Sequence, residues 1–231
     1  MQAVILVAGR GTRMKELTEG VPKGLLQVAG RSLLEYALDV LPENVDEVIF
    51  IVGYLGSMIH DKFGAEYFGK RILYIEQEEL NGTAGALWLA QDVLKDRFIV
   101  MNGDDIYDRA DVVRITRAKD WALLVTRVPH MNEGGKVIMN KKGLITNIVE
   151  GEHDGKPSLM SANVFLLDTR IFSSKLIPKA PDSSEYGLPQ TMLVASKQLG
   201  IVIEPIAATN WIQISRPEDL RKAEEILASH F

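Results

Sequence analysis

Short apolar runs and amphipathic stretches alternate along most of this chain of 231 residues. Runs of valine, isoleucine and leucine predict buried strands, whereas apolar residues spaced three and four apart predict helices, with glycine and proline at the boundaries. The predicted strands are Ala3–Val7, Glu47–Val52, Arg71–Glu76, Phe98–Asn102, Ala122–Arg127, Lys136–Met139, Ile145–Glu150, Ser161–Leu167 and Ile201–Ile206. The predicted helices are Ser32–Val40, Ser57–Phe63, Ala84–Leu94, Ala110–Ala118, Arg170–Ser174, Gly187–Lys197 and Pro217–Ser229. This alternation favours an α/β fold, in which helices cover both faces of a mostly parallel sheet.

The pattern changes after Trp121, where shorter strands are joined by turn-rich segments. No low-complexity linker separates the two parts, and the sequence contains no repeat. We therefore expect a single domain over residues 1–231, with one half over roughly 1–120 and the other over 121–231. For the last predicted helix we expect Ser215 as the N-cap and packing against the sheet edge.

Composition narrows the class of protein. A formal net charge of -5 argues against broad electrostatic binding to nucleic acid or to an anionic membrane. The absence of cysteine excludes disulfides, cysteine catalysis and thiolate metal sites, and it suits a reducing cytoplasm. No apolar run approaches the roughly 20 residues of a membrane span. We expect a cytoplasmic protein that binds neither nucleic acid nor membranes.

The first predicted strand leads into a cluster of glycines and cations that contains Gly9, Gly11 and Arg13, and Lys23 follows a short distance later. Glycines let the backbone approach an anion closely, and exposed N–H groups and positive side chains then hold its oxygens. A Gly-x-Gly pair alone is also typical of a tight strand–helix turn with solvated arginines. These residues alone favour phosphate binding only slightly over a structural turn.

Three further segments place polar residues at the ends of predicted elements. Gln77–Leu87 is rich in small residues and begins a helix, whose free N–H groups can face a ligand. Asp104 and Asp105 follow the strand Phe98–Asn102, at the edge where open α/β sheets bind ligands, and carboxylate oxygens suit Mg²⁺. A capping or turn role explains Asp105 well. The third segment, Trp211–Leu220, leads into the last helix.

In this order the segments resemble those of the sugar-phosphate nucleotidylyltransferases, whose signature begins L-A-A-G-x-G-T-R and continues to P-K-x-L-L. The matching residues are Val4–Met14 and Val21–Leu26. The family's base-holding segment, Q-x-x-x-x-G-T-A-x-A-L, matches Gln77–Leu87, and its W-x-D segment ending in P-E-D-L matches Trp211–Leu220. The resemblance covers nearly the whole chain. It implies a Rossmann-like, mostly parallel mixed sheet flanked by helices, of the nucleotide-diphospho-sugar transferase type.

The resemblance also implies a role for each residue that matches a family position. The implied catalytic residues are Arg13, Lys23 and Asp104, and the implied ligands of a Mg²⁺ cofactor are Asp104 and Gln213. In the first half, the implied nucleotide-binding residues are Leu6, Ala8, Gly9, Gly11, Gln77, Gly82 and Thr83. In the second half, the implied acceptor-binding residues are Glu150, Asn163 and Glu185.

On the nucleotide side the sequence departs from the family pattern at three positions. Gly24 replaces a second proline after the signature lysine, which we expect to loosen the loop. Asn81 replaces the proline before the base-holding glycine. Gln213 stands where the family has a metal-binding aspartate, so it brings an amide oxygen and no charge.

On the acceptor side the departures concern charge and backbone. Glu150 matches the glutamate of the family's E-K-P segment, but the lysine that follows it there is absent. Lys156 comes a few residues later and is one candidate to replace that lysine. Asn163 stands where the family usually has glycine.

The implied reaction moves a nucleoside monophosphate from an NTP to a sugar phosphate and releases pyrophosphate. The segment Gly82–Leu87 is most similar to mannose-type guanylyltransferases, which favours GTP and mannose 1-phosphate. One alternative is a CTP-dependent cytidylyltransferase acting on inositol phosphate or another polyol phosphate. Another, suggested by Gln213, is a nucleotide-binding regulatory subunit with weak activity. Members of the family often form homo-oligomers, but the sequence identifies no interface.

Overall fold

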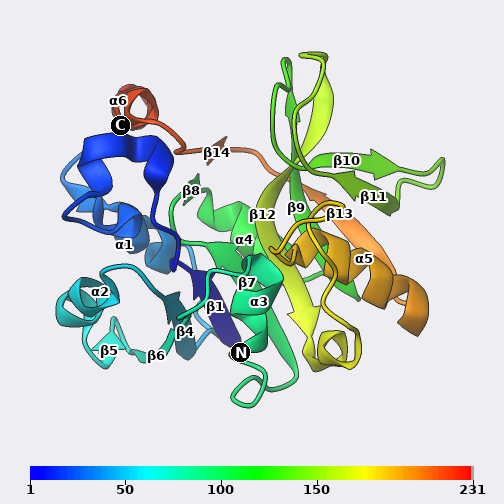
Figure 1. Ribbon diagram of the computed structural model, residues 1–231, viewed down its shortest axis with the longest axis horizontal. Coiled ribbons are helices and arrows are strands. Elements are labelled where there is room, and N and C mark those ends of the chain that lie inside the picture. Colours follow the sequence, from blue (N-terminus) through cyan, green and yellow to red (C-terminus); the bar gives the residue numbers. More distant parts are fainter. Residues whose placement is uncertain (230–231) are drawn as a thin grey trace.

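The computed structural model describes residues 1–229 and places a mixed sheet of ten strands at the centre of the molecule (Figure 1). Four strands from the first half pair in parallel, and their near-continuous apolar sequences reflect burial on both faces. These strands are β1 (Gln2–Leu6), β4 (Glu47–Val52), β6 (Lys70–Glu76) and β7 (Arg97–Asn102). β1 lies between β4 and β7, so its carboxyl end lies in the middle of the edge where these parallel strands end.

The remaining strands extend the same sheet at its two ends. They are β5 (Glu66–Tyr67), β9 (Trp121–Val128), β10 (Lys136–Met139), β11 (Ile145–Val149), β12 (Ser158–Asp168) and β13 (Ile203–Ala207). The long strand β12 pairs antiparallel with both β7 and β9, and β13 joins β9 in parallel. The hairpin of β10 and β11 adds to β12, while β5 pairs with β6 at the opposite end. Backbone hydrogen bonding therefore runs without a break from the first half into the second.

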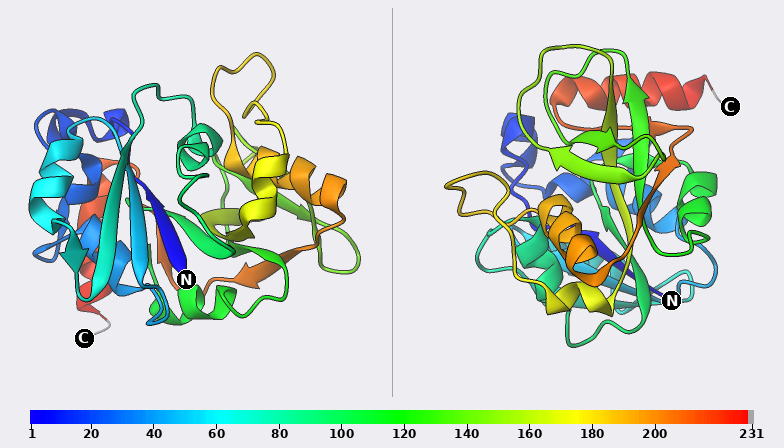
Figure 2. Two further views of the ribbon diagram at one scale, coloured as in Figure 1. Left: turned by 90° about the horizontal axis from the view of Figure 1, so that it is seen from below. Right: turned by 90° about the vertical axis from the view of Figure 1, so that its right-hand side faces the viewer.

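Helices cover both faces of this sheet (Figure 2). One face carries α1 (Leu33–Asp39), α2 (Gly56–Phe63) and α4 (Arg109–Ile115). The other face carries α3 (Thr83–Trp88) and α5 (Leu188–Leu199).

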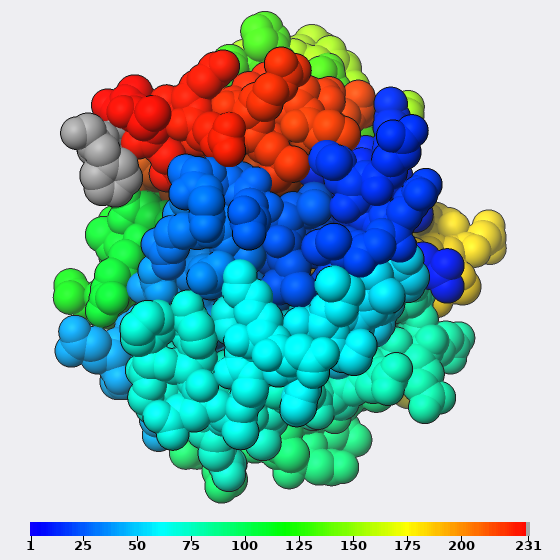
Figure 3. Space-filling model, turned by 90° about the vertical axis from the view of Figure 1, so that its left-hand side faces the viewer, coloured from blue at the N-terminus to red at the C-terminus, as the bar shows by residue number. Residues whose placement is uncertain are grey.

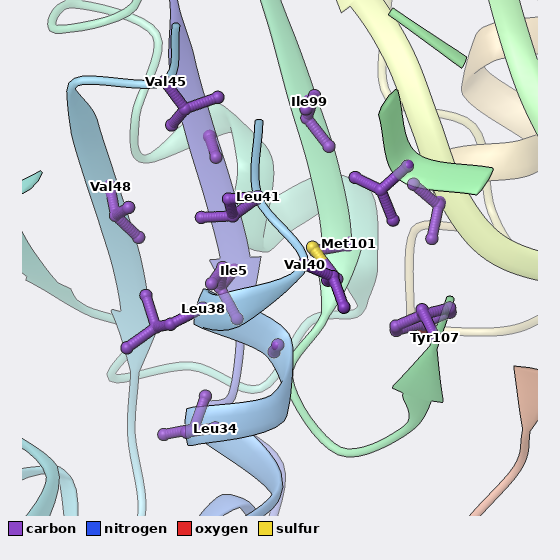
Figure 4. Close-up of a cluster of buried hydrophobic side chains, with 14 of the residues drawn as sticks. Ile5, Leu34, Leu38, Val40, Leu41, Val45, Val48, Ile99, Met101 and Tyr107 are labelled. Atoms are coloured by element: carbon purple, nitrogen blue, oxygen red, sulfur yellow. The ribbon is translucent and has the colours of Figure 1, made fainter. Parts of the chain in front are cut away.

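Side chains of β1 alternate between the two cores, because neighbouring residues of a strand point to opposite faces. Ile5 packs in the first core, and Val4 packs in the second. Figure 4 shows the first core, where Leu34 and Leu38 of α1 face the sheet near Ile5.

The sequence predicted that the last helix packs against the sheet edge. In the structure α6 (Pro217–Ala228) instead packs against the N-terminal loop region. Its buried Ala223 meets Met14 and Ile214 in a small separate core, and Figure 3 shows the helix beside the N-terminal segment. The expected N-cap was wrong by one residue. Arg216 is the N-cap, because the Asp219 side chain turns back and accepts hydrogen bonds from the backbone N–H groups of Ser215 and Arg216.

Two small sheets lie outside the central one. They consist of β2 (Gln27–Val28) with β3 (Arg31–Ser32), and β8 (Ile106–Tyr107) with β14 (Trp211–Ile212). Three 3-10 helices complete the described chain, at Thr12–Thr18, Lys23–Leu25 and Thr169–Ser173.

The predicted helix Ala84–Leu94 is shorter in the structure, where the α-helix ends at Trp88. Residues beyond it form tight turns closed by bonds between residues three apart, such as Ala90 N–H to the Leu87 carbonyl at 3.0 Å. These turns continue the apolar periodicity without continuing the α-helix. Within residues 1–229, none of the helices combines the length and apolar character required to cross a bilayer.

Candidate active site

A cleft of about 370 Å³ opens at the carboxyl ends of β1 and β7, where open α/β sheets bind ligands. Seven of the residues singled out in the sequence line it: Leu6, Gly9, Gly11, Arg13, Lys23, Asp104 and Glu185. The structure adds five lining residues that we had not selected: Val7, Thr12, Met14, Gly24 and Ser215. Thr12 and Met14 lie inside the quoted signature and could have been selected from it. Ser215 lies in the quoted segment Trp211–Leu220, but we expected it to cap the last helix and not to line the cleft.

Other selected residues lie outside the lining of the cleft. They are Ala8, Gln77, Gly82, Thr83, Glu150, Asn163 and Gln213. Ala8 is 6% exposed and packs beneath Gly53, whose backbone approaches the Ala8 carbonyl closely. A Cβ on Gly53 would lie 2.8 Å from the Ala8 carbonyl oxygen and 3.1 Å from Ala8 Cβ.

The loop after β1 needs glycine at position 11 for two reasons. Gly11 has a φ of 64°, in the left-handed region that side chains disfavour. A Cβ there would also lie 3.1 Å from both Lys23 Cβ and Thr18 Cγ2. Thr18 then fixes the loop by donating a hydrogen bond to the Gly11 carbonyl at 3.1 Å. The loop is thus tightly folded around the base of the Lys23 side chain.

Lys23 reaches across the floor of the cleft to the end of β7. Its ammonium group donates to Asp104 Oδ2 at 2.6 Å and to the backbone carbonyl of Ile214. Gly24 does not loosen this segment, contrary to our expectation. It is buried, and a Cβ there would lie 2.9 Å from Leu34 Cγ. The missing second proline is therefore replaced by close packing on α1.

The two adjacent aspartates after β7 differ sharply in environment. The side chain of Asp104 is 31% exposed and faces the cleft, whereas Asp105 is 3% exposed. Burial, reinforced by the negative charge of Asp104, raises the pKa of Asp105 to about 7. Asp105 accepts hydrogen bonds from the Ile214 N–H at 2.9 Å and from Trp211 Nε1 at 3.2 Å. It therefore binds the segment before α6, which is more than the local turn role expected from the sequence.

The predicted base-holding residue Gln77 is buried and turns its amide nitrogen into its own loop. Its Nε2 donates to Asn81 Oδ1 at 3.0 Å and to the Gly82 carbonyl at 3.3 Å. Asn81, which replaces the family's proline, thus helps to fix the loop through its side chain.

This loop is joined directly to the segment that carries Glu185. The Ala84 N–H donates to the Tyr186 carbonyl at 3.0 Å, and the Tyr186 N–H donates to the Asn81 carbonyl at 2.7 Å. Thr83 Oγ1 accepts from the Leu188 N–H at 2.9 Å. The structure therefore brings the predicted nucleotide loop and one predicted acceptor segment into direct contact.

On the acceptor side, Asn163 explains why glycine is usual at its position. Its φ of 55° is left-handed, and asparagine tolerates this conformation better than most other residues with a side chain. Its N–H donates to Ser161 Oγ at 3.2 Å, where the pairing of β12 with β9 is irregular.

Glu150 lies next to Ser161 in space, since both approach Gly135. Burial raises the pKa of the Glu150 carboxyl, while the positive charges of Lys179 and His153 lower it. Within residues 1–229, no hydrogen bond to this carboxyl is formed, and its side chain lies outside the lining of the cleft.

The cations of the second half occupy different settings. Lys179 lies 3.6 Å from Glu185 Oε2, close to the cleft. Lys156 instead pairs with Asp154 at 2.6 Å, and its side chain is 76% exposed. Across the mouth of the cleft, Arg13 donates to Glu133 Oε1 at 3.3 Å, an exposed contact that links the two halves.

The protein side chains at the cleft could supply few ligands to a metal ion, so a bound metal would be held mainly by the substrate phosphates. No group of three histidine, cysteine, aspartate or glutamate side chains in the described part of the chain could hold a metal. Asp104 provides a cleft-facing carboxylate, whereas Gln213 is exposed and lies outside the cleft lining. Magnesium commonly uses one or two carboxylates together with substrate phosphates and water, so the Asp104 carboxylate fits this ion.

Comparison with known proteins places this geometry in context. A family model described as "Nucleotidyl transferase" matches residues 2–228. The chain is 31% identical over 235 residues to the UTP–glucose-1-phosphate uridylyltransferase AglF of Haloferax volcanii, covering 98% of this chain and 96% of that protein. It is 29% identical to the bifunctional protein GlmU of Methanocaldococcus jannaschii, covering 98% of this chain. There it spans about half of the relative, 54% of its length.

A solved structure supports the architecture. The inositol-1-phosphate CTP transferase of T. maritima superposes with a TM-score of 0.77 over 98% of this chain and 94% of that one, at 21% sequence identity. The expected nucleotide-diphospho-sugar transferase fold, with its mostly parallel mixed sheet and flanking helices, is thereby confirmed.

Proposed function

The chain belongs to the nucleotidyl transferase family, and we propose that it moves a nucleoside monophosphate from an NTP to a sugar phosphate and releases pyrophosphate. The observation that carries the proposal is the Lys23–Asp104 pair, 2.6 Å apart on the floor of a cleft lined by the glycine-rich loop. Such a transfer asks mainly for positioning and charge neutralisation, and these groups supply both.

The reaction is a direct in-line displacement. An oxygen of the acceptor phosphate attacks the α-phosphorus and forms a new P–O bond. The bond from the α-phosphorus to the oxygen that bridges it to the β-phosphorus breaks, and pyrophosphate leaves with the electron pair. The attacking oxygen is already ionised near neutral pH, so no general base is required. None of the described residues that line the cleft is a histidine, in agreement with this.

Two cations offset the repulsion between the two anionic substrates. Lys23 uses two of its three N–H donors on Asp104 and on the Ile214 carbonyl, so the third can bind a phosphate oxygen. Arg13 lines the cleft beside it, and its exposed contact with Glu133 can be exchanged for the triphosphate. Asp104 would hold Mg²⁺, which when bound supplies further positive charge against the phosphates.

The first substrate pair to test is UTP with glucose 1-phosphate. The uridylyltransferase AglF matches nearly the full length of this chain, which supports this pair. GTP with mannose 1-phosphate is the second pair, because the segment Gly82–Leu87 resembles mannose-type guanylyltransferases. Glu150 and Glu185 would accept hydrogen bonds from sugar hydroxyls in either case.

The deciding experiment measures pyrophosphate release with Mg²⁺, crossing UTP, GTP, CTP, dTTP and ATP against glucose, mannose and inositol phosphates. Turnover of one pair far above the others supports the proposal and identifies both substrates. The variant Asp104→Asn serves as the negative control. Binding of a nucleotide without release from any pair would contradict the proposal and favour a nucleotide-binding regulatory subunit, the alternative that Gln213 suggests.

A further inference from the structure

Asp105 is a buried carboxyl next to the cleft that the proposed reaction does not use. Its partners are distant in sequence: Oδ1 accepts from the Ile214 N–H at 2.9 Å, and Oδ2 accepts from Trp211 Nε1 at 3.2 Å. Both partners belong to the segment that links β13 to α6, in which β14 runs beside β8 (Figure 1). Asp105 thus uses both oxygens to hold a segment 106 and 109 residues away.

Ile214 transmits this contact to the floor of the cleft. Its N–H is bound by Asp105, and its carbonyl accepts a hydrogen bond from the Lys23 ammonium. Ile214 itself is fully buried at 0% exposure, so its backbone has no access to water as a substitute partner. The position of the Ile214 carbonyl therefore depends on the carboxyl of Asp105.

Lys23 in turn depends on that carbonyl. The Lys23 side chain is only 12% exposed, and its ammonium lies between the Ile214 carbonyl and Asp104 Oδ2. With both acceptors in place, the direction of the third N–H is fixed. If the Ile214 carbonyl moved, the ammonium would keep Asp104 alone and could swing away from the phosphates.

We propose that Asp105 is a positioning residue for Lys23, acting through the backbone of Ile214. This inference rests on the proposed function, because it assigns Asp105 to the placement of the cation that the transfer requires. Displacing a reacting or charge-stabilising group by about 1 Å can cost on the order of 100-fold in rate, so the effect should be visible in kcat.

The chain contains a matched control in Asp111. This aspartate is also fully buried, at 0% exposure, and it holds the beginning of the same segment. Its Oδ2 accepts from the Thr209 N–H at 2.6 Å, and its Oδ1 accepts from Thr209 Oγ1 at 2.9 Å. Asp105 and Asp111 therefore fix one segment at two points, but only Asp105 holds the residue whose carbonyl binds Lys23. Asp111 also pairs with Arg114 at 2.5 Å, so a merely structural role predicts that Asp111→Asn disturbs the protein at least as much as Asp105→Asn.

The test compares Asp105→Asn with Asp111→Asn in the full chain, at a temperature where circular dichroism shows both to be folded. Asparagine has the same shape but only one acceptor oxygen, so each variant should lower the melting temperature. We expect Asp105→Asn to lower kcat for pyrophosphate release by about tenfold to 100-fold, with a small change in the KM of the NTP. Asp111→Asn should keep kcat within about twofold of the wild type. Equal effects of the two variants on kcat would overturn the inference.

A double variant tests whether Asp105 acts through Lys23. In a Lys23→Ala background, adding Asp105→Asn should leave the residual turnover unchanged, because the group it positions is gone. Independent, multiplying losses would overturn the inference. Asp105→Ala, which removes both acceptors, should be slower still than Asp105→Asn, and the isosteric variant decides alone if the alanine variant does not fold. If the wild type turns over no substrate pair, the proposed function fails. If the wild type is active and Asp105→Asn is equally active, only this inference fails.

Discussion

Charged side chains on the two sides of the cleft differ in how exposed they are and how closely their partners contact them. On the wall formed by β1 and β7, the Lys23 side chain is 12% exposed and its ammonium has two acceptors. On the opposite wall, Glu185 is 51% exposed and its contact with Lys179 is 3.6 Å long. Lys23, which we propose to bind phosphate, is therefore held more tightly than Glu185, which we propose to bind the acceptor. Arg13 is closer to Glu185 in this respect, since its side chain is 60% exposed.

The largest effect should come from removing the tightly held cation, Lys23. Lys23→Ala removes the cation between the substrates, and we expect kcat for pyrophosphate release to fall by about 100-fold to 1000-fold, as for the loss of one preorganised donor. Circular dichroism should show an intact fold. The control Lys62→Ala removes a lysine that pairs with Glu35 at 2.7 Å outside the cleft, and it should keep normal turnover. Near-normal turnover of Lys23→Ala would show that the transfer does not require this cation.

A smaller effect should follow from separating the walls where their loops touch. Gly82 has a φ of 95°, and a Cβ there would lie 2.4 Å from the Tyr186 carbonyl oxygen. Gly82→Ala must therefore push the acceptor segment away, and we expect the KM values of both substrates to rise about tenfold, equivalent to ~1.4 kcal/mol. Gly64→Ala is the control, since Gly64 has a similar left-handed φ of 61° but open space around it. Equal KM values in the two variants would disprove the loop coupling.

Removing a positive charge near Glu185, on the more exposed side of the cleft, should have a weaker effect on kinetics. The charge of Lys179 acts on Glu150 and lies 3.6 Å from Glu185, the two carboxylates that we propose to bind the acceptor, whereas Lys156 pairs with Asp154 at 2.6 Å. We expect Lys179→Gln to raise the KM of the sugar phosphate about fivefold, a typical scale for exposed charges, without changing that of the NTP. Lys156→Gln makes the same change in net charge and should leave both unchanged. If instead Lys156→Gln raised the acceptor KM, Lys156 would be the replacement for the family's missing lysine.

The smallest effect concerns stability and depends on pH. Because burial raises the pKa of Glu150 above 4.5, its ionised form destabilises the folded state at pH values above the folded pKa. Glu150→Gln should therefore melt at a higher temperature than the wild type at pH 8, and the gap should close as the pH falls to 4.5. The exposed Glu152→Gln controls for charge. A gap that stays constant over this pH range would exclude the buried carboxyl as its cause.

The longer strands of the central sheet were predictable because apolar runs mark most of them as buried elements. The same holds for the glycine-rich loop, since Gly11 and Arg13 stand together in the sequence. The short strands β8 and β14 could not be predicted, because each has two residues and depends on pairing Trp211 with Tyr107 across the chain. Tertiary contact, not local pattern, creates such elements.

The lining of the cleft was predictable where its residues follow one another in the glycine-rich loop, and contacts beneath it were missed where residues distant in sequence meet. Asp105 illustrates the limit, since a Gly-Asp-Asp sequence is typical of a turn and gives no sign of Ile214 or Trp211 as partners. Gly24 illustrates another, because the sequence indicated a looser loop and the structure shows packing against Leu34. Substitutions within a known pattern are therefore interpretable only with their neighbours in space.

The pairing of β12 with β7 determines how this molecule can move. Backbone hydrogen bonds tie Val164–Asp168 to the strand that ends at the cleft floor. Rotation of one half against the other at this point would break this ladder. Accommodation of different substrates is left to the loops and side chains above the sheet. Changes in those loops would reshape the surface of the cleft while the sheet beneath it stays the same.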